Sequence, residues 1–476
     1  MISDFQIIPA GADENRLGEG LLKVWNNGLK ASCCRWIAII LACEVTTASG
    51  QVALQNSLAG AAAAGDRSQQ MQSERSQGYT FKEGDFQMLM VPAMGLEWND
   101  NINLAQTNEL ADEIVTPTVR ITASYPFTQR NLLYLDVTVA YDWYLEHPQF
   151  SSFELNSSSG TGLSFDFVVK DITVNLHDWI SYSEGAGQNG SATSTANPTA
   201  LNTANSFVGN TANGSVNNTA SYGTFQNTAG LSVAWDLNKV TLSTGYDHQN
   251  ILATSGQFDN INHAAEMLFV RAGLQVHPKA TVGLESTAAF TTYEQPSLND
   301  NDAYTIGPYI EFRPGRFFSL IIRGGYTIYD FQNTSTAIQT TDQNSWYAGV
   351  NIAHQPSDSV SYSLDIGREV QLGIQSDLLE DWYVRPNISL KIIKDLDIAA
   401  SFFYEHGDQG VGSTGTLPGN HNGTFDWYGG TLSLQHALTS QLTLALSYRI
   451  TLRSSDTPND GYTQNLVALQ LTYHPK

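Results

Sequence analysis

From about residue 86 to the C-terminus, hydrophobic and polar residues alternate along the chain with a period of two. In 442–453 every second residue is Leu, Tyr or Ile, and the residues between them are Thr, Ala, Ser and Arg. Segments 131–145, 266–276 and 396–405 follow the same pattern. Because successive side chains of a β-strand point to opposite faces, this pattern predicts strands with one apolar and one polar face.

The alternation predicts eighteen strands in all, and sixteen is the alternative count. Their expected ranges are 86–98, 113–125, 131–145, 161–169, 171–183, 222–236, 239–250, 263–276, 279–293, 302–313, 316–329, 344–355, 358–372, 378–391, 395–406, 422–436, 440–452 and 462–473. The first of these strands is the least regular, because Pro92 lies inside it and proline cannot donate a ladder hydrogen bond.

Short and long connections alternate between these strands. Turns such as 277–279 and 438–441 are short, whereas most of the long connections have ten residues or more. Outer-membrane barrels show this alternation, with short turns in the periplasm and long loops outside. In hydrocarbon each unpaired backbone polar group costs several kcal/mol, so a membrane-spanning sheet closes on itself. We therefore predict an all-β, transmembrane, up-and-down antiparallel β-barrel over 86–476; a soluble sandwich or β-helix is the alternative.

Composition argues against several other classes of protein. The chain carries 23 Lys and Arg against 46 Asp and Glu, a formal charge of −23. A nucleic-acid partner is not expected, because phosphate binding needs a basic surface. Charged residues make up only 14% of the chain, and aromatic residues make up 11%, which is unlike a disordered protein. After residue 50 no apolar run approaches the roughly 18 residues of a membrane-spanning helix.

The first 50 residues have the composition of a secretory signal. Lys30 and Arg35 precede the apolar run 36–42, and small residues follow at 48–50. This order predicts cleavage between Gly50 and Gln51. A buried or anchoring helix is one alternative, and lipidation within a lipobox-like sequence at Cys43 is another.

All three cysteines lie in this targeting segment, so cleavage after Gly50 would leave a mature chain without any. Disulfides and Cys-ligated metals would then be excluded. Residues 51–85 are rich in Ala, Gln and Ser. We expect them to form a flexible or short helical lead-in in the periplasm.

A family resemblance is carried by the first predicted hairpin. Residues 91–101 read Val-Pro-Ala-Met-Gly-Leu-Glu-Trp-Asn-Asp-Asn, and 112–117 read Asp-Glu-Ile-Val-Thr-Pro. This stretch resembles the opening hairpin of the outer-membrane β-barrel porins, in which an aromatic residue and Asp-Asn close the first strand. The resemblance implies a bacterial outer-membrane barrel for passive transport, without catalytic residues.

The chain departs from the porin pattern in two places. Porin barrels end on an aromatic residue, whereas Tyr473 is followed here by three more residues. The third long loop, 184–221, has the position and length of a porin constriction loop, but Glu184 is its only charge. The sequence is therefore compatible both with a loop that folds into the pore and with a loop that lies on the outer surface.

If the apolar faces meet lipid, the polar faces line the lumen, because Arg or Lys on the lipid face costs roughly 2–4 kcal/mol at mid-membrane. The candidate lumen residues are Arg120, Arg271, Arg323, Arg385, Arg449, Asp136, Asp142, Glu285, Glu311 and Asp365. We expect Arg323, Arg385 and Arg449 to form a basic strip opposite acids of the early strands, and such a field would orient polar solutes. The alternative is that these arginines pair locally with acids.

Motifs of catalysis and metal binding are not found in the sequence. The ten histidines are scattered, and only His263 with Glu266 or Asp247 with His248 come near a catalytic pair. We therefore expect no enzyme activity, no metal and no cofactor.

The sequence predicts a porin in the outer membrane of a Gram-negative bacterium, through which small hydrophilic solutes such as ions and sugars diffuse. A surface-display or adhesion barrel with a plugged lumen and a polysaccharide exporter are the alternatives. Expected partners are the solutes, outer-membrane lipids including lipopolysaccharide, and further copies of the chain.

The charges of the chain are polarised along the predicted barrel. The nine long loops hold eighteen acids and one base, Arg453, whereas Lys and Arg collect at the short turns. This distribution favours cation entry, or divalent ions that bridge the outer rim to anionic headgroups.

Overall fold

The computed structural model describes residues 79–475 except for short gaps and one long one. The gaps are 129, 158–161, 184–222, 255, 316, 336–337, 374–376, 394, 411–412, 415–422 and 457–460. The signal segment with Gly50 and Gln51, residues 51–78 and loop 184–221 lie outside the described residues. The predictions made for them therefore stay predictions.

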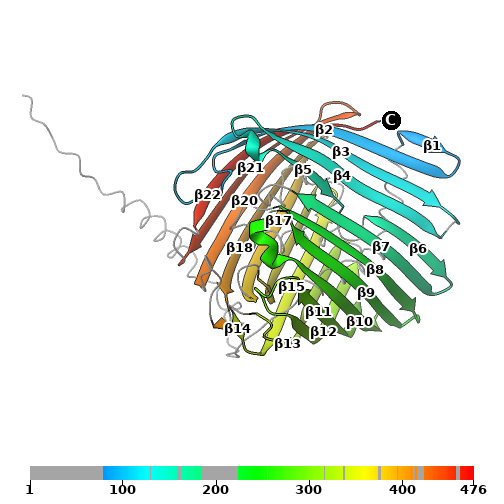
Figure 1. The fold of residues 1–476 in the computed structure, drawn as a ribbon. Helices are drawn as coiled ribbons and strands as arrows, with labels where there is room; N and C mark the ends of the chain where they lie inside the picture. The colour runs from blue at the N-terminus through cyan, green and yellow to red at the C-terminus, as the bar shows by residue number, and fades with distance from the viewer. Residues whose placement is uncertain are drawn as a thin grey trace, which may run out of the picture. The chain divides into compact units, whose positions relative to one another are not determined.

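Eighteen antiparallel strand positions close into one barrel in the described part of the chain (Figure 1). The long strands are β2 (Phe86–Asn99), β3 (Asp112–Pro126), β4 (Leu132–Tyr144), β7 (Ile172–Ser183), β8 (Thr224–Asp236), β9 (Val240–Ala253), β10 (His263–His277), β11 (Ala280–Tyr293), β12 (Asn301–Gly315), β13 (Phe318–Phe331), β15 (Gln343–Ser357), β16 (Val360–Leu372), β17 (Leu378–Ile393), β18 (Leu396–Gln409), β20 (Gly423–Ala437), β21 (Leu442–Ser455) and β22 (Tyr462–Tyr473). The remaining position is shared by β5 (Ser152–Asn156) and β6 (Leu163–Val169). The predicted fold class and the count of eighteen are confirmed.

The barrel closes where the first long strand meets the last. Residues Ala93–Asn99 of β2 pair with Leu466–Thr472 of β22. The residues of β2 before Ala93 have no partner in β22, and Pro92 is the first of them. Because proline has no backbone N–H, it leaves no donor unpaired at this position. The proline therefore fits an edge position, although β3 pairs along the whole of β2 on the other side.

Two expectations from the sequence are wrong. β1 (Phe81–Glu83) pairs with Phe86–Met88 of β2, so the end of the predicted flexible or helical lead-in is a β-hairpin that covers the free edge of β2. Residues 152–156 were expected in a loop but form β5, which pairs with the long-loop end of β4. A run of five residues is short enough to be hidden among loop residues.

Other small elements lie at the end of the barrel that carries the long loops, which we call the long-loop end. They are the 3₁₀ helices η1 (Pro148–Phe150) and η4 (Gly256–Ile261), and the paired strands β14 (Gln339–Thr340) and β19 (Ser413–Thr414). At the opposite, short-turn end, Asn238 and Asp395 adopt positive φ in tight turns, a conformation that Asn and Asp tolerate. Within the described residues, no helix has the length and apolarity needed to cross a membrane.

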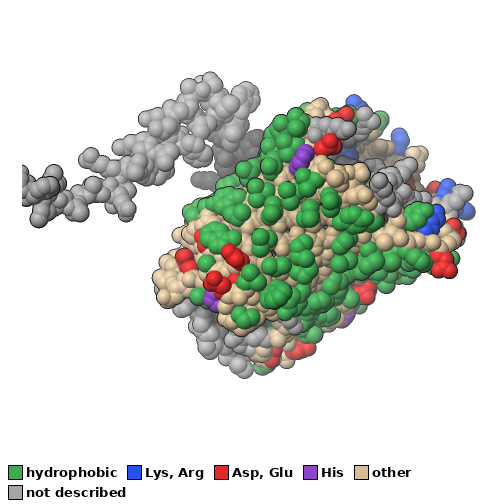
Figure 2. All heavy atoms as spheres, turned by 90° about the horizontal axis from the view of Figure 1, so that it is seen from above, with side chains coloured by type: hydrophobic (Ala, Val, Ile, Leu, Met, Phe, Trp, Pro, Cys, Tyr) green, Lys and Arg blue, Asp and Glu red, His purple; other side chains and the backbone are tan. Residues whose placement is uncertain are grey.

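The two faces of the strands differ as the alternation predicts. In β10, Leu268 and Val270 are exposed on the outer wall, whereas Met267 and Phe269 between them are buried on the inner side. Figure 2 shows hydrophobic side chains over most of the visible wall, with charged side chains mainly toward its ends. The outer wall is thus apolar and the inner wall largely polar.

Inward aromatic rings lie flat against the wall where a neighbouring strand has glycine. A Cβ at Gly367 would stand 2.4 Å from the Tyr383 hydroxyl, and one at Gly407 would stand 2.1 Å from the Phe425 ring. Glycine therefore provides the space that keeps these rings close to the wall rather than across the lumen.

Candidate functional site

The strand register places all ten candidate lumen residues on the inner face. Arg323 stands opposite buried Tyr309, Arg385 stands opposite Asp365, and Arg271 stands opposite Glu285. Directly paired residues of an antiparallel sheet share a face, so these groups point inward together.

On β3 and β4 the inward charges are paired or hydrogen-bonded. Arg120 holds Asp136 with two bonds, Nε to Oδ1 at 3.0 Å and Nη2 to Oδ2 at 2.6 Å. Thr116 donates its hydroxyl to Asp142 at 2.7 Å. Asp142 also hydrogen-bonds Glu154 of β5, an inward acid that the loop assignment had hidden.

Arg449 and Arg271 have different neighbours from each other. The charge of Arg449 acts on that of Glu97 on β2, across the seam of the barrel. The Arg271 guanidinium stacks over the Tyr309 ring at 3.9 Å from its centroid and lies 4.0 Å from Glu311. Stacking of this kind is attractive because the negative face of the ring meets the positive charge of the guanidinium.

Within the described part of the chain, Arg323 lies among several acids without a close ion pair. Among the described residues it has no ion-pair partner, although the charges of Glu285 and Asp365 act on it. Its side chain lies along Gly349 on the neighbouring strand, 3.5 Å from where a Cβ would stand. Glu285 accepts a hydrogen bond from the Tyr347 hydroxyl at 3.2 Å.

Arg385 differs from Arg323 because it forms a buried ion pair. Its Nε and Nη2 donate to Oε1 of Glu405 at 2.9 and 2.6 Å, and its guanidinium stacks over Tyr383. Both partners are almost fully buried. The local pairing that was the alternative to a basic strip therefore holds for Arg385 but not for Arg323.

Buried acids next to this pair were missed by the candidate set. Glu369 and Asp381 stand directly opposite each other on β16 and β17, and both are buried. The alternation does predict that both side chains point inward, because Glu369 follows the outward Arg368 and Asp381 precedes the outward Trp382. Their burial could not be found in this way, because it depends on which side chains of other strands pack around them.

A second group that the sequence did not reveal crosses three strands. His177 of β7 contacts Asp247 of β9 through Nε2 at 3.0 Å, and contacts Asn175 through Nδ1 at 2.9 Å. The imidazole reaches over Gly230 of β8, where a Cβ would stand 2.0 Å from the Asp247 carboxylate. The side chain of Asn175 in turn donates to Asp166 at 2.6 Å.

The two neighbouring His and acid pairs do not form catalytic arrangements. Asp247 points inward, whereas His248 points outward and bonds Glu266 at 2.8 Å. His263 is an odd-numbered, inward position of β10, and Glu266 lies on the opposite face. In the described part of the chain, no three His, Cys, Asp or Glu side chains converge as metal ligands.

The residues that follow the first strand join the first and last strands at the long-loop end. Asp100 accepts bonds from the backbone and side-chain nitrogens of Asn465 at 2.6 and 2.7 Å. Asn101 donates to the Thr463 carbonyl at 2.9 Å. The Asp-Asn sequence that carries the porin resemblance therefore clasps the seam between the first and last strands.

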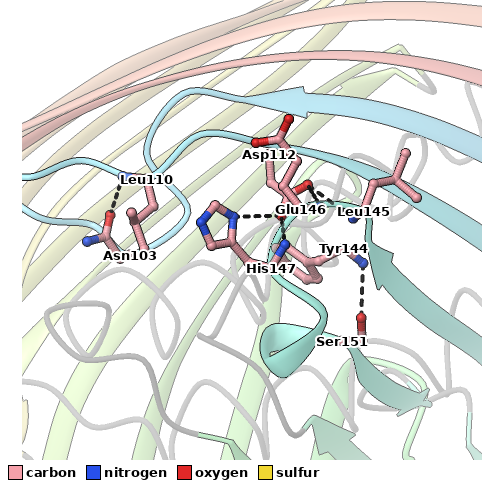
Figure 3. A network of polar contacts seen from close by, with 8 residues as sticks. All are labelled: Asn103, Leu110, Asp112, Tyr144, Leu145, Glu146, His147 and Ser151. Atoms are coloured by element: carbon pink, nitrogen blue, oxygen red, sulfur yellow. Dashed lines mark hydrogen bonds and ion pairs between the residues drawn. The ribbon is translucent and has the colours of Figure 1, made fainter.

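The acidic residue that opens β3 holds the next loop. The Asp112 carboxylate accepts bonds from the backbone N–H groups of Leu145, Glu146 and His147 and contacts the His147 ring at 3.0 Å (Figure 3). Four partners for one carboxylate fix the start of the 145–151 connection over β3 and β4.

Three further loops are joined at the long-loop end by Asp377, which is 1% exposed. It accepts bonds from the Asn299 backbone at 2.9 Å, from the Asn299 side chain at 2.7 Å and from the Thr340 hydroxyl. Asn299 also accepts a bond from the Ser335 backbone at 2.7 Å. We call this group the Asp377 latch; it ties the connections after β11, β13 and β16 to one another.

A closed antiparallel barrel with an apolar outer wall and a polar inner wall defines an outer-membrane β-barrel, because only closed sheets satisfy their backbone in lipid. By the same rule the short-turn end faces the periplasm and the long-loop end faces outside. The predicted location is therefore confirmed.

Comparison with solved structures finds porins. The chain is similar to OccK2 (OpdF) of Pseudomonas aeruginosa, solved in complex with glucuronate, with 11% identity, a TM-score of 0.43 and coverage of 81% of this chain and 98% of that one. It is also similar to a BenF-like porin of Pseudomonas fluorescens Pf-5, with 11% identity, a TM-score of 0.44 and coverage of 82% and 99%. Neither family models nor curated protein sequences give a match.

Proposed function

We propose that the protein is a porin through which small hydrophilic solutes diffuse passively. The observation that carries this proposal is the closed barrel of eighteen strand positions with charged and polar residues on its inner wall. Barrels of sixteen to eighteen strands are wide enough to leave an aqueous channel rather than a packed core.

The inner wall supports selection among polar solutes rather than free passage. Arg323, Glu285 and Asp365 place charges of both signs on neighbouring strands, and a solute that passes them meets a field across the lumen. The rings of Tyr383 and Phe425 pack against glycines on one side and hold the guanidinium groups of Arg385 and Arg453 over them on the other. The two rings therefore fix arginine side chains on the inner wall.

The Asp377 latch narrows the outer mouth in this proposal. Next to it Tyr293, Leu298 and Ile338 form an apolar cluster with almost no exposure. A mouth with a packed, hydrogen-bonded rim limits the size of solutes that enter. It is also the feature that favours the alternative, a surface-display barrel whose lumen is closed.

Liposome swelling with sugars of graded size tests the proposal. Vesicles that contain folded, heat-modifiable protein should swell with small sugars, and the rate should fall steeply as the sugar grows. The absence of swelling with the smallest sugar would favour the closed barrel, and swelling that does not fall as the saccharide grows would favour an exporter.

A further inference from the structure

A polar patch interrupts the apolar outer wall over β7 to β10. It lies in two neighbouring rows of directly paired residues, which are Asp178, Ala229, His248 and Glu266 in the row nearer the short turns and Ile180, Asn227, Asn250 and Ala264 in the next. One row closer to the short turns, Leu176 and Leu231 are directly paired and exposed on the outer wall, so the patch also faces outward. We call its polar members, Asp178, Asn227, His248, Asn250 and Glu266, the outer polar patch.

The hydrogen bonds within the outer polar patch leave Asp178 incompletely satisfied. The side-chain nitrogen of Asn227 donates to Oδ1 of Asp178 at 2.6 Å. The Asn250 amide contacts Nε2 of His248 at 2.9 Å, and Nδ1 of His248 contacts Glu266 at 2.8 Å. Among the described residues, Asp178 has no second hydrogen bond and no ion pair, although an ionised carboxylate can accept several bonds.

Apolar residues border the patch toward the long loops as well. In the following row Tyr182, Phe225 and Leu252 are directly paired, and the Phe153 ring of β5 lies 6.1 Å from the Tyr182 ring. Outward apolar rows therefore lie both above and below the β7 and β8 part of the patch, which is enclosed within the apolar surface rather than part of its upper rim.

Asp178 lies inside the hydrocarbon layer. It stands six residues above Ile172, the exposed first outward residue of β7. At about 3.4 Å per residue and a strand tilt of about 40°, this stretch rises roughly 16 Å. The apolar band of an outer-membrane barrel is about 25 Å tall, so the carboxylate lies well below its upper border. Glu266 stands ten residues above the exposed Val276 of β10 and rises roughly 26 Å, which reaches that border.

This depth decides what can cover the patch. Acyl chains offer no donor to a carboxylate, and lipid headgroups lie above the upper border of the apolar band. Charged side chains within a membrane are costly unless protein or water surrounds them, so the cover that Asp178 needs is a protein surface. Carboxylate and amide groups together donate and accept hydrogen bonds, so the patch is complementary to itself. A second copy of the chain presents the same groups at the same depth.

We propose that two copies of the barrel associate through the outer polar patch, about a two-fold axis normal to the membrane that passes between β7 and β8. Such an axis keeps both barrels upright and uses the same surface on each. It brings β8 of each copy opposite β7 of the other, so Asn227 of one copy faces Asp178 of the second, and the two Ala229 residues lie close together. Because this surface faces away from the lumen, the proposal does not depend on transport.

Cross-linking in lipid vesicles locates the contact. Ala229→Cys places a thiol beside the proposed axis, and Ala400→Cys places one on the outer wall between Ile388 and Leu432 as the matched control. A short bifunctional thiol reagent should give a dimer band with Ala229→Cys, and Ala400→Cys should give no more than the wild-type background. Equal cross-linking of the two variants, or none with Ala229→Cys, would overturn the proposal.

A second test removes the polar groups while keeping the barrel suited to lipid. The double variant Asp178→Leu with Asn227→Leu makes the patch apolar and should weaken association about tenfold, the effect of losing two polar pairs within a membrane. Fluorescence energy transfer between labelled copies in vesicles, diluted with lipid, measures the association. Glu113→Leu, which replaces an exposed acid on the outward face of β3, is the control and should change nothing.

Each variant is first shown to be folded by its heat-modifiable migration, and native mass spectrometry of the wild type counts the copies. A wild-type monomer, or association that the double variant leaves unchanged, would contradict the proposal. A trimer whose Ala229→Cys variant does not cross-link would place the contact between copies on another face of the barrel, and the two-fold contact through the outer polar patch would then be wrong.

Discussion

At the scale of single residues, glycine at position 230 of β8 leaves room for the contact between His177 of β7 and Asp247 of β9. Any larger residue than glycine at 230 would stand in the line of that contact, 2.0 Å from the carboxylate and 2.7 Å from the imidazole. The bridge is therefore as dependent on Gly230 as on its own two partners.

We predict that Gly230→Ala destabilises the barrel by about 1–3 kcal/mol, because the buried Asp247 and His177 would lose their hydrogen bond. Urea unfolding in detergent or lipid vesicles measures the change. Gly315→Ala is the matched control, since nothing lies within 4 Å of the added Cβ, and it should be neutral. Equal effects of the two substitutions would show that the bridge contributes nothing.

Arg323 and Arg385 give opposite predictions although both are inward arginines. Removing Arg323 takes a charge from the lumen without breaking an ion pair, so Arg323→Ala should shift the reversal potential toward cations, while Arg323→Lys keeps it. Removing Arg385 leaves Glu405 buried without its partner, so Arg385→Ala should cost about 3–5 kcal/mol of stability. Bilayer recordings and unfolding curves measure the two effects; an Arg323→Ala channel with unchanged selectivity would remove Arg323 from the solute path.

At the scale of elements, the period of two is sufficient to locate the long strands, because each must present an apolar face to lipid along its whole length. Pro92 did not interrupt the first strand, since it stands where β2 leaves β22. The period fails where a strand is broken. Between β5 and β6 the chain leaves the ladder, and Ser157 bonds Ile180 of β7 instead.

The candidate site was predictable only in part for a similar reason. Alternation shows which side chains point inward, and it predicted the same inward position for Arg323 and Arg385. It does not show which charges on neighbouring strands meet, because a long side chain can reach its direct or its diagonal neighbour. Nor does it show which inward groups become buried or which loops contact one another, and for this reason Asp381 and the Asp377 latch were missed.

The Asp377 latch should behave as a local unit. Asp377→Ala removes the shared acceptor of Asn299 and Thr340, so the outer loops should open more often while the strands stay folded. Hydrogen exchange should be faster at the amide of Asn299, and single-channel currents should become noisier. Asp358→Ala, which removes a carboxylate from an exposed turn at the short-turn end, is the control. Loops that exchange as slowly as in the wild type would show that the latch is redundant.

At the scale of the whole molecule, the formal charge of −23 is distributed by end rather than spread evenly. Acids such as Asp300, Asp330 and Asp456 lie at the long-loop end, whereas Lys239, Lys279 and Arg313 lie at the short-turn end. A solute from outside therefore meets negative charge first.

This asymmetry predicts a cation-selective channel. In a KCl gradient the reversal potential should have the sign of potassium permeation, and the selectivity should weaken at high salt as the rim charges are screened. Anion selectivity at low salt, unaffected by calcium, would contradict the assignment of the acidic rim to ion entry.

The central claim is that the barrel is open to water, and single-channel recording of the folded wild-type protein tests it most directly. The account predicts stepwise insertions whose conductance is ohmic and rises with salt concentration. Heat-modifiable protein that inserts into the bilayer without any conductance step would contradict it, because a closed lumen cannot serve passive diffusion.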